Sequence, residues 1–245
     1  MSSLSILFIG LLLGMKHATE ADHLAAVATL ATRQGTLGQA VKQGVAWGIG
    51  HTFTLMIFGG IVLALGKSIP PDMERMLELA VGAMLVALGI DVLRRLWQQR
   101  IHFHVHRHAD GTRHVHAHSH AGEVRNRYAP HRAAMHRHAH AATLPVRALA
   151  IGMMHGMAGS AALILLSLEA VGSVPMGMLY IGLFGAGSIL GMALLSVAIA
   201  IPLRYSAGYF TWLHNGLAGA VGAGTCLLGL YMVYEIGLVE GLLLR

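Results

Sequence analysis

Charged side chains are scarce in this sequence: Asp, Glu, Lys and Arg make up 11% of the 245 residues, whereas 55% are hydrophobic. A soluble domain carries roughly 25% charged residues, so this composition excludes that class and predicts a polytopic membrane protein. The net charge of +6 does not indicate nucleic-acid binding, because no basic face of a folded domain accompanies it.

The sequence has a single cysteine, and it lacks both a complete phosphate-binding loop and the motif of zinc proteases. Cys226 is the single cysteine, which excludes a disulfide framework and leaves a membrane thiol-redox relay without its second thiol. Gly66-Lys67-Ser68 resembles the end of a phosphate-binding loop, but Ile61 stands where that loop needs its first glycine. No His-Glu-x-x-His motif of a zinc protease occurs. Transport would therefore be secondary, or would depend on a partner for ATP.

Six apolar segments are long enough to cross a bilayer, and a polar stretch separates the third from the fourth. They cover approximately residues 4–31, 39–65, 73–97, 145–171, 176–203 and 212–236. The first segment has no basic region before it and no small-residue cleavage site after it. We therefore expect a retained helix rather than a signal peptide.

Short motifs recur in order at a nearly constant offset of 137–140 residues, once in each helix of the two halves. Gly14-Met15-x-His17 returns as Gly152-Met153-x-His155, Gly48-Ile49-Gly50-His51 as Gly185-Ala186-Gly187-Ser188, and Ala80-Val81-Gly82-Ala83 as Ala220-Val221-Gly222-Ala223. An odd number of helices per copy inverts the second copy in the membrane. The sequence thus predicts an all-α polytopic membrane protein with six transmembrane helices in two inverted three-helix repeats. The repeats are 1–97 and 144–245, and 98–143 forms a loop without regular structure.

Glycine pairs at i, i+4 spacing are expected where two membrane helices approach closely, although some arise by chance in a chain with 31 glycines. The pairs are Gly10-x3-Gly14, Gly44-x3-Gly48 and Gly187-x3-Gly191.

The excess of arginine in the central loop predicts the orientation of the chain. It places that loop in the cytoplasm and both termini outside the cytoplasmic (inner) membrane.

The first apolar segment contains His17, Glu20, Asp22 and His23. Each carboxylate at membrane depth costs about 2.5–3.5 kcal/mol, so a bound cation is the simplest compensation. At roughly 100° per residue, His17, Asp22 and His23 point in different directions from a regular helix. The helix must therefore break near Gly14, or partners must come from other helices.

We predict that His17, Asp22, His23 and His51 contact a metal ion, with Glu20, His155, Thr52 and Ser160 behind them or as alternate ligands. Imidazole and carboxylate together suit borderline divalent ions such as Ni, Co, Cu and Zn. The alternative is that buried His–carboxylate pairs serve as structural contacts or as a proton relay.

The central loop holds twelve of the seventeen histidines. His-rich tracts of this kind are typical of metal-binding segments, and the alternative is a pH-sensitive linker. The predicted loop ligands are His102, His104, His106, His108, His114, His116, His118, His120, His131, His136, His138 and His140.

His17-x4-Asp22-His23 resembles the HX4DH signature of the NiCoT nickel/cobalt transporters, and Gly50-His51-Thr52 resembles their second motif. The Gly152-to-Ser160 stretch is similar to the UreH-like, urease-associated branch, and the loop to RcnA-type exporters. Two departures are a missing first helix and His155-Gly156-Met157 in place of the second-half aspartate motif. The resemblance implies transport of nickel or cobalt.

The leading hypothesis is a secondary transporter of Ni(II) or Co(II), not an enzyme, with uptake favoured over efflux. The expected partners are the metal ion, the bilayer and cytoplasmic metallochaperones, with no prosthetic group and no nucleic acid. The competing hypothesis from another class is an intramembrane zinc hydrolase built on His17, Asp22, His23, His51 and Ser160.

Overall fold

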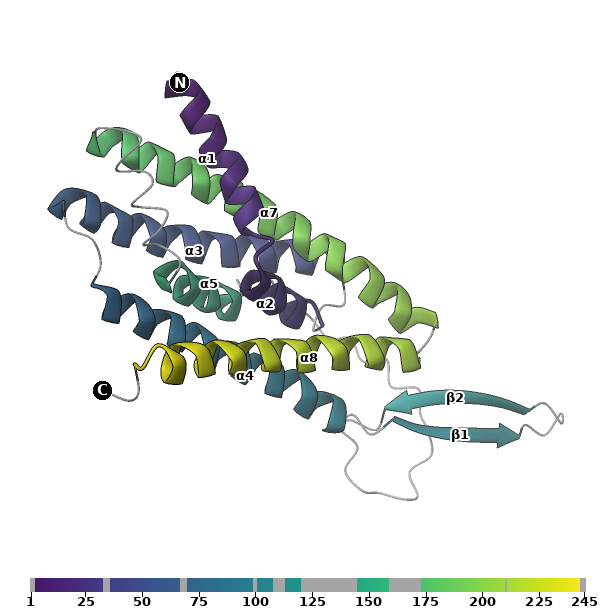
Figure 1. Cartoon of the computed structure of the whole chain (residues 1–245). Coiled ribbons are helices and arrows are strands. Elements are labelled where there is room, and N and C mark those ends of the chain that lie inside the picture. Colours follow the sequence, from purple (N-terminus) through teal and green to yellow (C-terminus); the bar gives the residue numbers. More distant parts are fainter. Residues whose placement is uncertain are drawn as a thin grey trace.

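The structure is a computed structural model that describes residues 3–32, 36–66, 70–98, 101–107, 113–119, 145–158, 173–209 and 211–242. The helices, labelled as in Figure 1, are α1 (Ser3–His17), α2 (Ala21–Ala31), α3 (Leu37–Leu65), α4 (Pro71–Gln98), α5 (Val146–Ala158), α7 (Val174–Tyr209), α8 (Thr211–Tyr234) and the π-helix η1 (Glu235–Val239). Two strands, β1 (Ile101–Arg107) and β2 (Arg113–Ser119), form a hairpin.

Within the described residues, four helical stretches are long and apolar enough to cross a membrane, which supports the predicted membrane class. They are Leu37–Leu65, Pro71–Gln98, Val174–Ser206 and Trp212–Val239. The first apolar segment is not one continuous span, because α1 ends at His17 and α2 begins at Ala21. The fourth is described only to Ala158, and its remainder lies outside the described residues.

The helices are arranged in layers (Figure 1). α3 packs along α7, α4 packs along α8, and the short helices α2 and α5 lie between these two pairs. α1 packs on α7, and α5 packs on α3. The two short helices therefore bring their ends into the middle of the bundle, where polar side chains are shielded from the surface.

The predicted glycine pairs all lie where helices meet, so this prediction is confirmed. A Cβ added to Gly14 would overlap the carbonyl oxygen of Phe184, and one on Gly191 would lie 2.7 Å from the Cβ of Ala18. Similar close neighbours surround Gly10, Gly44, Gly48 and Gly187. These glycines let the backbones approach to distances that a larger side chain would prevent.

Between their ends, the long helices expose mainly apolar side chains. On α3, Ile49, Phe53, Ile57 and Ile61 follow one another every four residues and are 43–54% exposed. Histidine, serine and threonine side chains are instead among the buried residues. This distribution is the one expected where lipid rather than water surrounds the helices.

The central segment, expected to lack regular structure, contains the β1–β2 hairpin. Its antiparallel register pairs His102 with His118, His104 with His116, and His106 with His114. The strict alternation of histidine with Phe, Val and Ala has the period of a strand, which accounts for the difference. The remaining predicted loop ligands lie outside the described residues: His108, His120, His131, His136, His138 and His140.

Candidate metal centre

The break between α1 and α2 brings His17, at the end of α1, close to Asp22 and His23, at the start of α2. The amides of Thr19 and Glu20 bond to the carbonyls of Lys16 and His17 at 2.9 and 3.0 Å, which tightens the last turn of α1. The Thr19 hydroxyl also donates to the Lys16 carbonyl at 2.6 Å. Glu20 then adopts an extended conformation, with φ −64° and ψ 151°, and α2 starts in a new direction. Gly14, near which a break was expected, is therefore still helical, and the break lies a few residues further along, after His17.

Glu20 precedes α2 but does not cap it through its side chain. Its carboxylate lies 2.9 Å from Nδ1 of His17. His17 is the last residue of α1 and is 7% exposed, whereas the Glu20 side chain is 57% exposed. This contact holds the Nδ1 side of the His17 ring and leaves Nε2 for another partner.

Asp22, in the first turn of α2, contacts two histidines. Its Oδ1 lies 3.0 Å from Nδ1 of His23, and its Oδ2 lies 3.2 Å from Nε2 of His155. His155 stands near the end of α5, so this carboxylate joins α2 to α5. A carboxylate on one ring nitrogen fixes the tautomer of an imidazole and makes the other nitrogen a better metal ligand.

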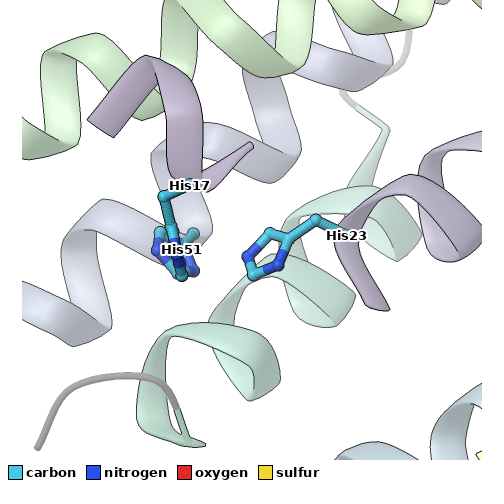
Figure 2. Close-up of side chains that lie close together, drawn as sticks. All are labelled: His17, His23 and His51. Carbon is cyan, nitrogen blue, oxygen red and sulfur yellow. The ribbon is translucent and has the colours of Figure 1, made fainter. Parts of the chain in front are cut away.

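His51 completes the cluster from α3. It is the central residue of that helix, fourteen residues from either end (51 − 37 = 65 − 51 = 14). The ring centroids of His17 and His23 lie 4.4 Å apart, and that of His51 is 5.3 Å from each. Figure 2 shows the His23 ring turned toward the other two. The ring centroid of His155 lies 4.6 Å from that of His23.

Several ring nitrogens of this cluster are buried without a hydrogen-bond partner among the described residues. They are Nε2 of His17 and His23, both nitrogens of His51, and Nδ1 of His155. One nitrogen each from His17, His23 and His51 lie within 4.8 Å of one another. Each unpaired buried group costs about 1–3 kcal/mol, a cost that a shared cation would remove. Structural contacts alone would leave these nitrogens unsatisfied.

The sequence around His51 fixes the position of its ring. Thr52 donates to the carbonyl of Gly185 on α7 at 3.2 Å, and the Thr54 hydroxyl lies 3.0 Å from the carbonyl of Met153 on α5. Gly50 packs against the backbone of α5 at Leu149. α3 is therefore held on both sides of His51, which places the imidazole between α1, α2 and α5.

The structure brings five of the predicted residues together: His17, Asp22, His23, His51 and His155. Glu20 lies next to them through His17. Thr52 does not join the cluster, because its hydroxyl bonds to the backbone of α7. Ser160 lies outside the described residues. Two aromatic neighbours, Trp47 and Phe184, are contacts that the sequence analysis missed.

Taken together, the fold and the cluster define a helical membrane protein with a buried centre of imidazoles and carboxylates. The chain is similar to the urease accessory protein UreH of Bacillus sp. (strain TB-90), with 36% identity over 242 residues that cover 98% of this chain and 95% of that protein. It therefore belongs to the UreH family of urease accessory proteins. No protein-family profile and no solved structure matches the chain.

Proposed function

We propose that this protein is a secondary transporter of a divalent transition-metal ion, with Ni(II) as its main substrate and Co(II) as a second. The observation that carries the proposal is the group of buried, unpaired imidazole nitrogens at the centre of the bundle. Borderline divalent ions prefer such nitrogen ligands, whereas Mg²⁺ and Ca²⁺ prefer oxygen.

In this proposal the ion is held by one nitrogen each of His17, His23 and His51, whose ligand atoms lie within 4.8 Å of one another. Asp22 and Glu20 supply the negative charge that balances the ion, and they orient the rings of the histidines that they contact. His155 is an alternate ligand, because it forms a second compact group with Asp22 and His23.

The family supports nickel as the substrate. The relative is named a urease accessory protein, which describes a helper rather than an enzyme. Supply of nickel is a role that fits a membrane-embedded helper of urease, and the HX4DH resemblance to nickel/cobalt transporters agrees with it. We therefore favour transport over the zinc hydrolase.

We further infer that the six apolar segments form two inverted repeats. The support is that contacts between helices occur in equivalent pairs. If each residue of one contact is replaced by the residue 137 or 138 positions away in the other half of the chain, the second contact of the pair results. The pairs are Gly14 at the Phe184 carbonyl with Gly152 at the Trp47 carbonyl, and Gly187 at the Leu11 carbonyl with Gly50 at the Leu149 carbonyl. Inverted repeats around a central site are the usual architecture for alternating access.

The test is nickel uptake by vesicles that contain the purified protein, with His51→Ala as the variant. We expect uptake to fall at least about tenfold, because the ion loses a ligand that no water can replace in this buried site. His214→Ala is the matched control, since His214 lies outside the cluster and its Nδ1 donates to the Leu203 carbonyl at 3.0 Å. Equal uptake by both variants and the wild type would refute the proposal.

We propose uptake into the cytoplasm as the direction, with the His-rich central segment as a metal-binding element on the cytoplasmic side. Efflux is the second candidate, because a hairpin that pairs histidine with histidine is also suited to collecting metal for export. Cells without the gene should contain less nickel by mass spectrometry if the protein imports it. A higher nickel content would assign efflux instead.

A further inference from the structure

The histidine centre lies between two aromatic side chains, one from α3 and one from α7. The indole of Trp47 stacks on His23 with a centroid distance of 5.6 Å and an angle of 17°, and it meets His155 at 5.4 Å. Phe184 lies 5.3 Å from the ring of His17. Trp47 is 0% exposed and Phe184 is 2% exposed. Both rings therefore shield the histidines.

The same sequence offset that relates the two halves relates these aromatics. Phe184 follows Trp47 by 137 residues (184 − 47 = 137), and His155 follows His17 by 138 (155 − 17 = 138). The contact of Trp47 with His155 at 5.4 Å thus corresponds to the contact of Phe184 with His17 at 5.3 Å. Equivalent positions in inverted repeats face opposite sides of the membrane.

The space behind the two aromatics differs. Trp47 also lines a small open pocket that has room for about one water molecule. Leu30, Gln43 and Ser196 are among its other walls. Phe184 instead belongs to a hydrophobic cluster with Leu55, Leu63 and Ile181. Trp47 thus contacts both the pocket and the histidine centre, whereas several packed side chains surround Phe184.

Two of the residues that line the pocket, Gln43 and Trp47, have polar groups without partners among the described residues. Nε1 of Trp47 and Oε1 of Gln43 are buried and make no hydrogen bond among the described residues. A buried indole N–H normally has an acceptor. Since no described residue bonds to the polar edge of this ring, packing holds the ring in place. The unpaired Gln43 oxygen is suited to bind a water of a hydrated cation.

We propose that Trp47 and Phe184 are the two gates of the metal centre, and that the pocket behind Trp47 widens, when the indole moves, into the passage through which a partly hydrated divalent cation reaches the centre. The inference rests on the proposed transport function for its purpose. A gate must move to admit the ion without being one of its ligands. Loss of the Trp47 ring should therefore speed both entry and release of the metal while the equilibrium affinity stays the same.

The experiment measures release of Ni²⁺ from the full-length protein in lipid nanodiscs after rapid mixing with excess EDTA. We expect Trp47→Ala to release nickel at least tenfold faster than the wild type, with a Kd within threefold of its value. Trp47→Phe, which keeps a ring, should give a smaller acceleration. Trp97→Ala is the matched control, because Trp97 is 81% exposed at the end of α4 and should leave both quantities unchanged.

Unchanged release in Trp47→Ala would overturn the proposal. A Kd that rises by the same factor as the release rate would also overturn it, because Trp47 would then hold the ligands in place rather than close the site. If Trp47→Ala does not fold, Trp47→Phe with wild-type release would likewise overturn it. Failure of the transport function is a separate result: the wild-type protein would bind nickel but show no vesicle uptake, whatever the release rates of the variants.

Discussion

Nickel uptake should be almost abolished by Asp22→Asn, the substitution for which we expect the largest functional effect. One Asp22 carboxylate accepts from two imidazoles, His23 at 3.0 Å and His155 at 3.2 Å. The asparagine keeps one acceptor oxygen, so at least one of the two histidines loses its partner and its fixed tautomer. Such supporting contacts are worth about 10–100-fold in metal affinity, and we expect the upper end because a balancing negative charge is lost as well.

Isothermal titration of the purified variant with Ni²⁺, together with vesicle uptake, measures this effect. Glu20→Gln is the matched control because it also removes one negative charge. Glu20 contacts only the His17 ring of the cluster, and its side chain is 57% exposed, against 25% for Asp22, so water screens its charge and can take its place. We expect the control to lose about tenfold or less in affinity. If Asp22→Asn bound and transported nickel as well as Glu20→Gln does, Asp22 would have no special role in the centre.

The folded protein should lose much of its stability when Gly187 becomes alanine. An added Cβ at Gly187 would overlap the carbonyl oxygen of Leu11 and lie 3.1 Å from the amide nitrogen of Met15. These are backbone atoms of α1, which cannot rotate away, so α1 would be pushed off α7 together with His17. Overpacking of this kind typically costs about 1–3 kcal/mol, which for a chain of this size lowers the melting temperature by roughly 2–12 °C.

Gly182→Ala on the same helix provides the control, because an added Cβ there meets nothing within 4 Å. Alanine favours a helix over glycine by about 0.8–1.0 kcal/mol, so this variant should be as stable as the wild type or slightly more stable. The melting temperatures of the two detergent-solubilised variants can be compared by heating samples to a series of temperatures. Size-exclusion chromatography then measures the fraction that remains folded at each temperature. Equal melting temperatures would show that α1 and α7 are not packed as closely as described.

The membrane class and the main residues of the site were predictable because intramembrane polar side chains are costly. His17, Asp22, His23 and His51 stand out against their apolar neighbours in the sequence, and the structure places them together. The position of the helix break was less predictable. We expected the helix to break near Gly14, because glycine is a poor helix former. Gly14 instead remains helical, and its lack of a side chain allows close contact with the backbone of Phe184. Thr19 and Glu20 end the helix instead.

The aromatic neighbours of the centre were not predictable from the sequence. Trp47 is one apolar residue in an apolar helix, and its sequence neighbours do not show that it is buried against His23 rather than packed against lipid. The repeat offset could have pointed to them, since it relates Trp47 to Phe184. The repeat was recognised from glycine and histidine positions, however, and not from aromatic ones. Likewise, the double contact of Asp22 with His23 and His155 depends on where the bundle places α2 and α5, which no spacing in the sequence specifies.

The central claim is that a doubly charged metal ion binds between the histidines of α1, α2 and α3. An anomalous difference map at the nickel edge, from crystals of the protein grown with Ni²⁺, tests it most directly. The account predicts one strong peak at roughly 2.0–2.1 Å from a ring nitrogen of each of His17, His23 and His51, the bond length usual for a divalent metal and imidazole. A map with nickel only on the His-rich central segment, and none between these three rings, would contradict it.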